Sequence, residues 1–239
     1  MDFKEGEVIY VDKPLGWTSF RVVNRVRGTI QRFYHIKKLK VGHAGTLDPL
    51  ATGVMILCTG KATKQIENFQ YQTKEYVATL KLGATTPSFD GEHPEDAVFP
   101  VSHITPELVE ETIRKFTGEI WQVPPVYSAV KVDGKRAYNY ARNGEEVELK
   151  PKLLVIDEIE VLDFALPVLK IRVVCSKGTY IRALARDIGQ ALGSGAYLTA
   201  LERTRVGDKK LEDCWQVDDL MAFLEKEGQN IQPKSDEEK

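Results

Sequence analysis

Residues 42–58 read Gly42-His43-Ala44-Gly45-Thr46-Leu47-Asp48-Pro49-Leu50-Ala51-Thr52-Gly53-Val54-Met55-Ile56-Leu57-Cys58. Three glycines and a proline among the first twelve of these residues predict a loop, because both residue types interrupt regular structure. The five apolar residues at the end are typical of a strand buried in a core. The stretch therefore predicts a loop at the edge of the core, and this loop carries one carboxylate, Asp48.

Asp48 is the only acid between Lys13 and Lys64, an interval that holds ten Lys or Arg residues. The local formal charge is thus +9, whereas the whole chain carries −2. Nearby positive charge favours the ionised form of a carboxyl group. From this loop alone two roles remain open: a turn cap before Pro49, which is common for Asp-Pro pairs, and a catalytic carboxylate.

Composition indicates a soluble globular protein of 239 residues, long enough to bury a sizeable core. Cys58 and Cys175 lie in apolar runs, which predicts buried thiols in a reducing compartment. The four histidines have no zinc-site spacing, so we expect no metal. The N-terminus has no apolar signal region and no segment approaches membrane-spanning length, so we expect a cytoplasmic protein without a membrane anchor.

The nearly neutral total charge hides a segregation. Residues 88–112 carry seven acids and no Lys or Arg, and residues 207–239 carry a formal charge of −5. The basic residues gather around the Asp48 loop instead. This distribution favours a polyanionic partner at one face, and an ordinary solvated surface is the alternative.

Hydrophobic periodicity predicts alternating strands and helices without an internal repeat or linker. The expected strands are 8–11, 54–58, 75–83, 121–131 (broken by a diproline), 155–164, 168–175 and 196–205. The expected helices begin at Thr18 or Ser19, cover 62–69, 105–116, 136–142 and 217–225, and include one from Tyr180 that Gly189 and 193–195 end. Residues 86–101 are expected to form a mobile loop, and Asp133-Gly134 a tight turn. This order argues for one α+β domain on a mixed or antiparallel sheet.

Two residues outside the loop invite a functional interpretation. Arg182 lies one turn into the helix that follows strand 168–175, where a guanidinium can pair with a carboxylate from another loop. Taken alone, a surface arginine on the side of the helix away from the core is the commoner case. Tyr76 is most simply a core aromatic, although Lys74 and Glu75 beside it indicate a strand end near a surface.

Five motifs in chain order resemble the signatures of the TruB family, the bacterial tRNA pseudouridine synthases that modify uridine 55 in the T-loop. They are residues 12–19, the loop 42–53, residues 124–131, residues 134–138 and residues 178–182. The resemblance covers about residues 7–206. It implies an α+β fold with a pseudouridine-synthase-like mixed, mainly antiparallel sheet, flanked by helices and loops in a single catalytic domain.

The resemblance implies an isomerase that uses neither cofactor nor metal. Such an enzyme breaks the N-glycosidic bond of a uridine, turns the uracil and rejoins it through C5 to C1′. Asp48 falls on the family's essential aspartate, as a nucleophile on the ribose or the base, or as the base that removes a ribose proton. The target nucleotide must be flipped out of its stack to reach this carboxylate.

The remaining site residues follow from the same resemblance. Arg182 would pair with Asp48 and hold it ionised, and Tyr76 would stack on the target base and help to take the C5 proton. His43 would fill the gap that the flipped base leaves, and Lys13 would support the site. The substrate-binding set implied in this way is completed by Gly42, Leu201 and Tyr180, and by Lys131, Arg136 and Arg142 of an insertion at 123–150 that folds over the T-loop.

The chain departs from the family at its C-terminus. Many bacterial members continue into a PUA domain that binds RNA, whereas here a short acidic extension, 207–239, follows a catalytic domain of residues 1–206. We expect a monomer whose partner is the T-arm stem-loop of tRNA. Two other functions remain open: a non-catalytic tRNA-binding or folding module, and a nucleoside glycosidase, which usually needs two carboxylates at the bond.

Overall fold

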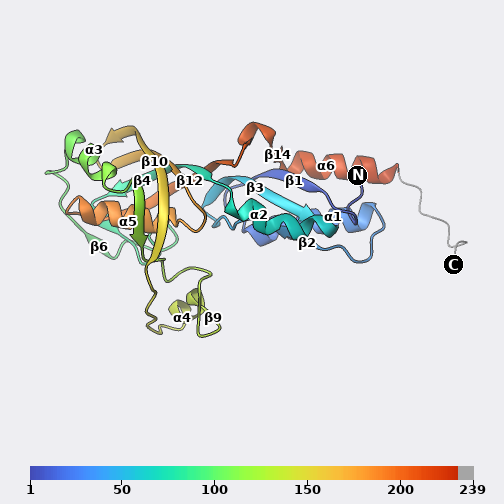
Figure 1. Ribbon diagram of the computed structural model, residues 1–239, viewed down its shortest axis with the longest axis horizontal. Helices are drawn as coiled ribbons and strands as arrows, with labels where there is room; N and C mark the ends of the chain where they lie inside the picture. The colour runs from blue at the N-terminus through green and yellow to red at the C-terminus, as the bar shows by residue number, and fades with distance from the viewer. Residues whose placement is uncertain (231–239) are drawn as a thin grey trace, which may run out of the picture. The chain divides into compact units, whose positions relative to one another are not determined.

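The structure, a computed structural model, describes residues 1–230, so residues 231–239 of the expected acidic extension lie outside the described residues (Figure 1). The chain forms two compact units: unit 1 comprises Met1–Gln72 and the chain from Arg203 onward, and unit 2 comprises Thr73–Glu202. Both are mixed α and β, and antiparallel strand pairs predominate, which confirms the predicted fold class.

Unit 1 is built on a sheet in which β3 pairs antiparallel with β1 and β2, and β1 pairs parallel with β14. Its strands are β1 (Val8–Lys13), β2 (Val41–His43), β3 (Ala51–Thr59), β13 (Lys209–Lys210) and β14 (Trp215–Gln216). Its helices are α1 (Ser19–Phe33), α2 (Ile66–Tyr71) and α6 (Val217–Gln229), with the 3-10 turns η1 (Gly60–Gln65) and η2 (Leu211–Asp213). The predicted cap is Thr18, whose side chain accepts a hydrogen bond from the Arg21 amide.

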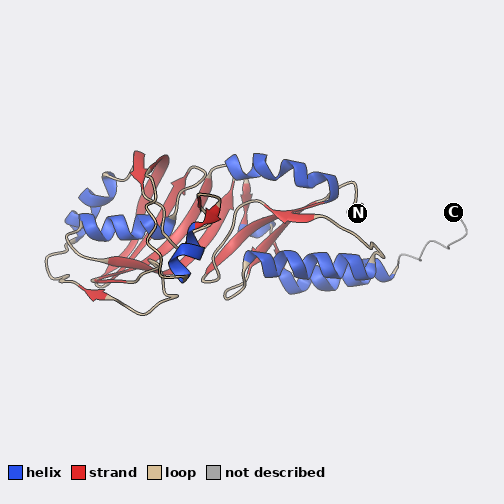
Figure 2. Cartoon of the chain, turned by 90° about the horizontal axis from the view of Figure 1, so that it is seen from below, coloured by secondary structure: helices blue, strands red, loops and turns tan. Residues whose placement is uncertain are grey.

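β3 is buried on both of its faces, which explains its continuous apolar sequence. Met55 and Leu57 pack into a cluster with α1 and α6, whereas Ile56 packs into a second cluster with η1 and α2. Figure 2 shows the long helices α1 and α6 on one side of these strands and α2 on the other. The loop that carries Asp48 therefore leads into the best-buried strand of unit 1.

The segment after Val206 contributes to the core of unit 1. Helix α6 buries Leu220, Met221 and Leu224 in the cluster that includes α1, and it runs to Gln229, four residues beyond the predicted end. β14 adds a parallel strand beside β1. The division into a catalytic domain of 1–206 and an extension of 207–239 stays a prediction.

Unit 2 contains an antiparallel sheet in the order β4-β11-β10-β7, with β12 next to β4. Its strands are β4 (Lys74–Leu82), β5 (Ala84–Thr85), β6 (Ala97–Val98), β7 (Gly118–Gln122), β8 (Lys131–Val132), β9 (Lys135–Arg136), β10 (Lys152–Ala165), β11 (Val168–Cys175) and β12 (Ala196–Val206), whose last residues belong to unit 1. Its helices are α3 (Pro106–Arg114), α4 (Ala137–Arg142) and α5 (Ile181–Ala191). The strand predicted over 121–131 is wrong in extent, because β7 ends at Gln122, before the diproline.

Helix α5 packs against β4 and positions two of the predicted site residues. β4 alternates strictly, with Tyr76, Ala78 and Leu80 buried and the residues between them half-buried. The prediction that Gly189 ends α5 is wrong. Gly189 lies inside the helix, where a Cβ atom would come 2.3 Å from the Ala196 nitrogen, so its absence lets β12 approach closely.

The insertion at 123–150 projects from the rest of unit 2 as a small lobe with β8, β9 and α4 (Figure 1). The predicted tight turn is confirmed: Asp133 and Gly134 both adopt positive φ between β8 and β9, as a two-residue hairpin turn requires. No helix among residues 1–230 is long and apolar enough to cross a membrane.

Candidate active site

The Asp48 loop of unit 1 is fixed on both sides of its carboxylate. The Ser19 hydroxyl, in the first turn of α1, donates to the Leu47 carbonyl and accepts from the Leu47 amide, both at 2.9 Å. The Gly16 amide donates to the Pro49 carbonyl at 2.8 Å, and the Ala51 amide to the Asp48 carbonyl at 3.0 Å. Hydrogen bonds thus hold the backbone at Leu47, Asp48 and Pro49, and Asp48 itself is half-buried.

Lys13 is fully buried, with 0% of its surface exposed, beneath this loop. Its Nζ donates to the carbonyls of Trp17 at 2.6 Å, Pro14 at 2.9 Å and Pro49 at 3.5 Å. Burial lowers the pKa of Lys13 to about 8, although the negative charge of Asp48 raises it. The ammonium group therefore ties the loop to the segment before α1, and it does not lie at the surface where a phosphate would bind.

Arg203 is a second buried cation at the loop, and sequence analysis missed it. Its side chain is 1% exposed, and it donates from Nε to the Val54 carbonyl at 2.7 Å and from Nη2 to the Gly45 carbonyl at 3.3 Å. It joins the two ends of the loop. No alternation could have located it, because the buried positions of β12 change phase between Leu198 and Arg203.

His43 and Gly42 lie in β2, at the start of the same loop. Burial lowers the pKa of His43, and the charge of Arg203 lowers it further. The Gly45 backbone raises the pKa, although Nδ1 of His43 has no partner in hydrogen-bond geometry within the described part of the chain. The neutral form of the imidazole is therefore favoured. Gly42 is a packing glycine, since a Cβ atom there would come 2.7 Å from Cδ1 of Ile66.

Arg182 lies in the first turn of α5 and is 6% exposed, so the expectation of a surface arginine is wrong. Its guanidinium donates to the carbonyls of Ser88 at 3.1 Å and Tyr127 at 2.9 Å. Its Nε lies 3.7 Å from Oδ2 of Asp90, a buried carboxylate within the acidic segment. Two loops of unit 2 therefore fix the direction of this side chain.

Residues 86–92, at the start of the loop predicted over 86–101, fold inward around Asp90. Thr86, Ser88 and Asp90 are buried. The Ser88 hydroxyl donates to Oδ1 of Asp90 at 2.6 Å, and the Glu92 amide to the same atom at 3.0 Å. The sequence signal for a loop, its Gly and Pro content, was correct, but it holds no information about which acid turns inward.

Tyr76 and Tyr180 also belong to unit 2. Tyr76 is 9% exposed and lies on the inward face of β4, two residues after the start of the strand. The backbone of Tyr180 is held by Gln122, whose amide accepts from the Tyr180 nitrogen at 2.9 Å and donates to the Tyr180 carbonyl at 3.2 Å. Gln122 replaces a side-chain cap at the start of α5. Leu201 is half-buried in β12.

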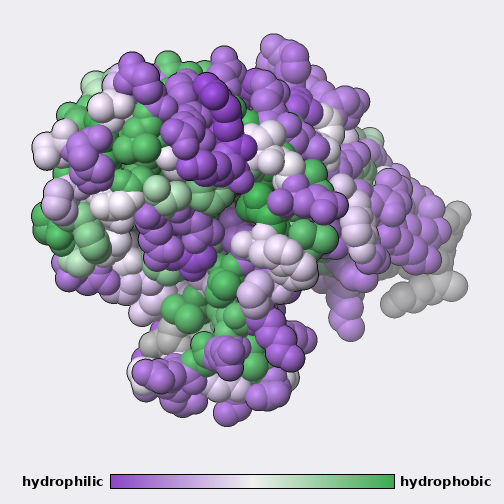
Figure 3. Space-filling view, turned by 60° about the vertical axis from the view of Figure 1, so that its left-hand side comes forward, coloured by the Kyte–Doolittle hydropathy of each residue, from purple (hydrophilic) through white to green (hydrophobic). Residues whose placement is uncertain are grey.

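The lobe at 123–150 presents cations beside tyrosine rings. The guanidinium groups of Arg142 and Arg136 lie 5.3 and 6.0 Å from the centre of the Tyr138 ring, and Lys131 is exposed on β8. A cavity of about 600 Å³ opens beside Val126 and the glutamates of 145–148. Apolar and hydrophilic side chains mix on the surface of this lobe (Figure 3).

The model of the TruB family pseudouridylate synthase N-terminal domain matches residues 31–181, and that of the tRNA pseudouridylate synthase B C-terminal domain matches residues 182–233. The chain belongs to the TruB family. It is therefore an enzyme of the isomerase class, and the recognition from its motifs is confirmed.

Curated relatives of this TruB chain match it over nearly its whole length. The tRNA pseudouridine synthase B of Phocaeicola vulgatus is 69% identical over 227 residues, 95% of this chain and 97% of the relative. That of Bacteroides fragilis is 72% identical over 214 residues, 90% and 92% of the two chains. That of Parabacteroides distasonis is 65% identical over 239 residues and covers both chains fully.

Chains of two solved complexes share the fold of this TruB member. A chain of the archaeal box H/ACA sRNP Nop10-Cbf5 complex is 28% identical with a TM-score of 0.65, and one of a Cbf5-Nop10-Gar1 complex is 31% identical with a TM-score of 0.67. The match covers 93% and 92% of this chain but only 54% and 55% of those chains. This chain thus spans about half their length.

The predicted site residues fall into both units of this TruB chain. Unit 1 brings together Asp48, Lys13, His43 and Gly42 around one loop, and unit 2 brings Tyr76, Tyr180 and Arg182 to β4 and the start of α5. The pairing of Asp48 with Arg182 and the individual catalytic roles stay predictions. Among residues 1–230, no group of three His, Cys, Asp or Glu side chains could hold a metal ion.

Proposed function

We propose that this enzyme isomerises uridine 55 in the T-loop of tRNA to pseudouridine, with Asp48 as the essential carboxylate. The N1–C1′ bond breaks, a C5–C1′ bond forms, the C5 proton leaves and N1 gains a proton, so product and substrate have the same mass. The names of the curated relatives support the tRNA substrate. The T-arm rests on the family resemblance of the motifs.

The anchored Asp48 loop carries the proposal. A carboxylate that attacks or deprotonates a substrate must hold its position, and hydrogen bonds at Leu47 and Pro49 fix the backbone on either side of Asp48. The buried ammonium of Lys13 adds a positive charge that favours the ionised carboxylate. Two buried cations, Lys13 and Arg203, thus hold the loop that carries Asp48 and place positive charge beside it.

Unit 2 supplies the other proposed roles. Arg182 pairs with Asp48, and its guanidinium is already oriented by Ser88, Tyr127 and Asp90. Tyr76 stacks on the flipped uracil, and neutral His43 fills the space that the base leaves in the RNA. The exposed cations of the lobe at 123–150 contact the irregular loop of the RNA, where unstacked bases are accessible.

The test uses a T-arm stem-loop RNA labelled with tritium at C5 of its uridines. Wild type should release tritium and leave the RNA mass unchanged, and Asp48→Asn should bind the RNA but release none. Asp208→Asn, which removes an exposed acid of the same unit, serves as the matched control and should keep full activity. Free uracil would indicate hydrolysis, and equal release by wild type and Asp48→Asn would assign the chemistry to another carboxylate.

A further inference from the structure

Helix α1 carries a row of arginines along one side. Arg21, Arg25 and Arg32 follow one another at spacings of four and seven residues, and all three are exposed. At 100° per residue they fall within an arc of about 40° on the helix surface, and they span about 16 Å along its axis. The opposite side, with Val22, Val26 and Ile30, packs into the core. We call this row, together with Gly28 inside it, the α1 stripe.

Within the described residues 1–230, the arginines of the α1 stripe have no acidic partner. Among residues 1–230, no carboxylate lies within ion-pair distance of Arg21, Arg25 or Arg32. Arg21 lies with its guanidinium 3.9 Å from the centre of the Trp17 ring, which orients it without neutralising it. Three full positive charges therefore face solvent along one helix.

Gly28 occupies the middle of the α1 stripe, and the chain's own packing does not require it. Apart from its chain neighbours and the backbone of its own helix, no atom of residues 1–230 lies within 4 Å of the place where its Cβ would be, and its φ is not in the left-handed region. A glycine inside an exposed helix costs about 1 kcal/mol relative to alanine. A bare backbone between arginines fits a surface that another backbone approaches closely.

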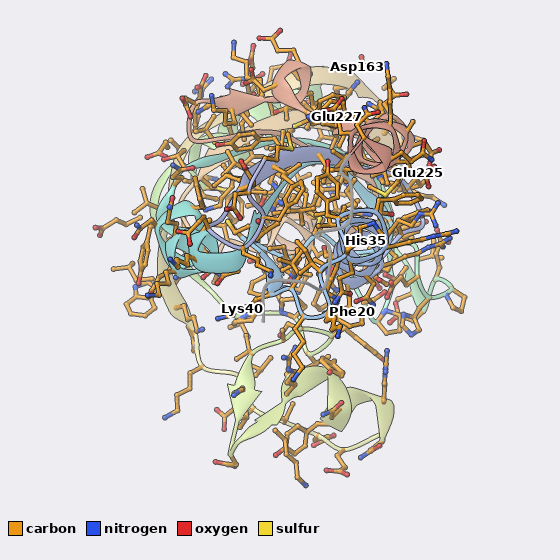
Figure 4. All side chains as sticks on the ribbon, turned by 90° about the vertical axis from the view of Figure 1, so that its right-hand side faces the viewer. Phe20, His35, Lys40, Asp163, Glu225 and Glu227 are labelled. Atoms are coloured by element: carbon orange, nitrogen blue, oxygen red, sulfur yellow. The ribbon has the colours of Figure 1, made fainter. Side chains whose placement is uncertain are left out.

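The α1 stripe begins at the proposed catalytic loop. Ser19, which holds Leu47 through two hydrogen bonds, precedes Arg21 by two residues. Phe20 is 64% exposed at the same end of the helix (Figure 4). Figure 4 also shows Glu225 and Glu227 of α6 on the other side of unit 1 from Phe20. Helix α1 itself carries four arginines and no acid, so a polyanion is attracted to its exposed side.

We propose that the α1 stripe binds the phosphate backbone of the paired stem that flanks the target loop of the RNA substrate. This inference rests on the proposed function and deepens it. A duplex carries a charge about every 1.7 Å of its axis, so about 16 Å of arginines faces several phosphates. Such contacts fix the register of the RNA without reading its sequence, and Gly28 lets the backbone lie close to the helix.

Two RNAs and two variants test the α1 stripe. One RNA has the full T-arm stem, and the other has the same loop closed by a minimal stem. Wild type should bind the full stem more tightly, and the double variant Arg25→Ala/Arg32→Ala should lose most of this preference. Its affinity for the full stem should fall about tenfold, and the slope of log affinity against log salt should become less steep by about 1–2. Arg114→Ala, an exposed arginine on α3 of unit 2, is the control and should change neither quantity.

Gly28→Gln supplies a second measurement that does not alter charge. It should improve helix propensity and so keep or raise the melting temperature, yet weaken binding to the full stem severalfold. If wild type converts the RNA but both variants bind the two stems as wild type does, the α1 stripe is not the contact and the proposed function stands. If wild type converts neither RNA, the proposed function itself fails. Loss of binding to anionic phospholipid vesicles with unchanged RNA binding would assign the α1 stripe to a membrane.

Discussion

Lys13 is a cation removed from water, and three backbone carbonyls replace its hydration shell. The folded state therefore disfavours its charge, and its pKa falls from 10.5 to about 8. Between these two values the unfolded chain binds more protons than the folded chain at this residue. The free energy of unfolding therefore rises with pH through this window, because its pH slope has the sign of that difference.

We expect the free energy of unfolding of wild type to rise relative to Lys13→Met by about 1 kcal/mol between pH 7.5 and pH 9. Urea titrations of both proteins across this range measure the difference. The three cysteines oppose the trend above pH 9, because burial raises the pKa of Cys58 and Cys175 to about 11 and that of Cys214 to about 12. Both proteins share these thiols, so the difference isolates Lys13, and a flat difference would contradict its burial.

Asp90 is a buried carboxylate that helps to position the guanidinium of Arg182. Removing it takes a carboxylate away from the buried guanidinium of Arg182, which also contacts the carbonyls of Ser88 and Tyr127, and it removes an acceptor of the Ser88 hydroxyl. We expect Asp90→Ala to cost about 3 kcal/mol in the free energy of unfolding, since it breaks a buried pair. Asp96→Ala, which removes an exposed acid of the same segment, should cost less than about 1 kcal/mol. Chemical denaturation of the two variants decides, and similar losses would refute the inward role of Asp90.

At the level of elements, two glycines inside helices have opposite reasons to be there. Gly189 of α5 is required by packing, because β12 approaches within the space of a Cβ atom, whereas the packing of α1 does not require Gly28. Gly189→Ala should therefore destabilise the protein by about 2 kcal/mol or more, although alanine is the better helix former. Gly28→Ala should stabilise it by about 0.5–1 kcal/mol. Thermal unfolding of the two variants measures the two stability changes. If both variants were more stable than wild type, helix propensity alone would govern the stability at these glycines.

The sequence predicted most helices and strands, because the burial of each one determines the spacing of its own apolar residues. Strict alternation located β4, whose two faces differ in burial, and a continuous apolar run located β3, which is buried on both faces. The turn at Asp133-Gly134 followed from residue types that tolerate positive φ. For α5, the glycine at 193 does follow the end of the helix, whereas Gly189 lies inside it. Gly189 is required by the close approach of β12, which follows it in the chain, and a local pattern does not contain that contact.

The candidate site could likewise be predicted only in part. Asp48, Arg182 and Tyr76 were named from the sequence, and so was Lys13, which holds the Asp48 loop, but two other positioning side chains were not. Arg203 and Asp90 became visible only in the structure, since their burial depends on the register of β12 and on the path of the acidic segment. A residue such as Arg203 is hard to recognise from sequence, because its partners are backbone carbonyls and every residue has one.

At the scale of the whole molecule, the last described helix is a structural part of unit 1. α6 buries Leu220, Met221 and Leu224 against α1 and β1. A chain ending at Val206 should therefore lose the cooperative unfolding of unit 1, and the amide protons of β3 should exchange rapidly. The milder Leu224→Ala should cost about 2–5 kcal/mol without changing the fold. Hydrogen exchange on both proteins tests this, and full protection of β3 in the truncated chain would show that 1–206 folds alone.

Unit 1 is discontinuous in the chain, because unit 2 lies between Gln72 and Arg203. During synthesis its first strands and α1 leave the ribosome well before the residues that cover them. At about 5–20 residues per second, the intervening residues take on the order of ten seconds to be made. During that delay the apolar side of α1 has no α6 to bury it, so the nascent chain passes through a stage in which this side is exposed.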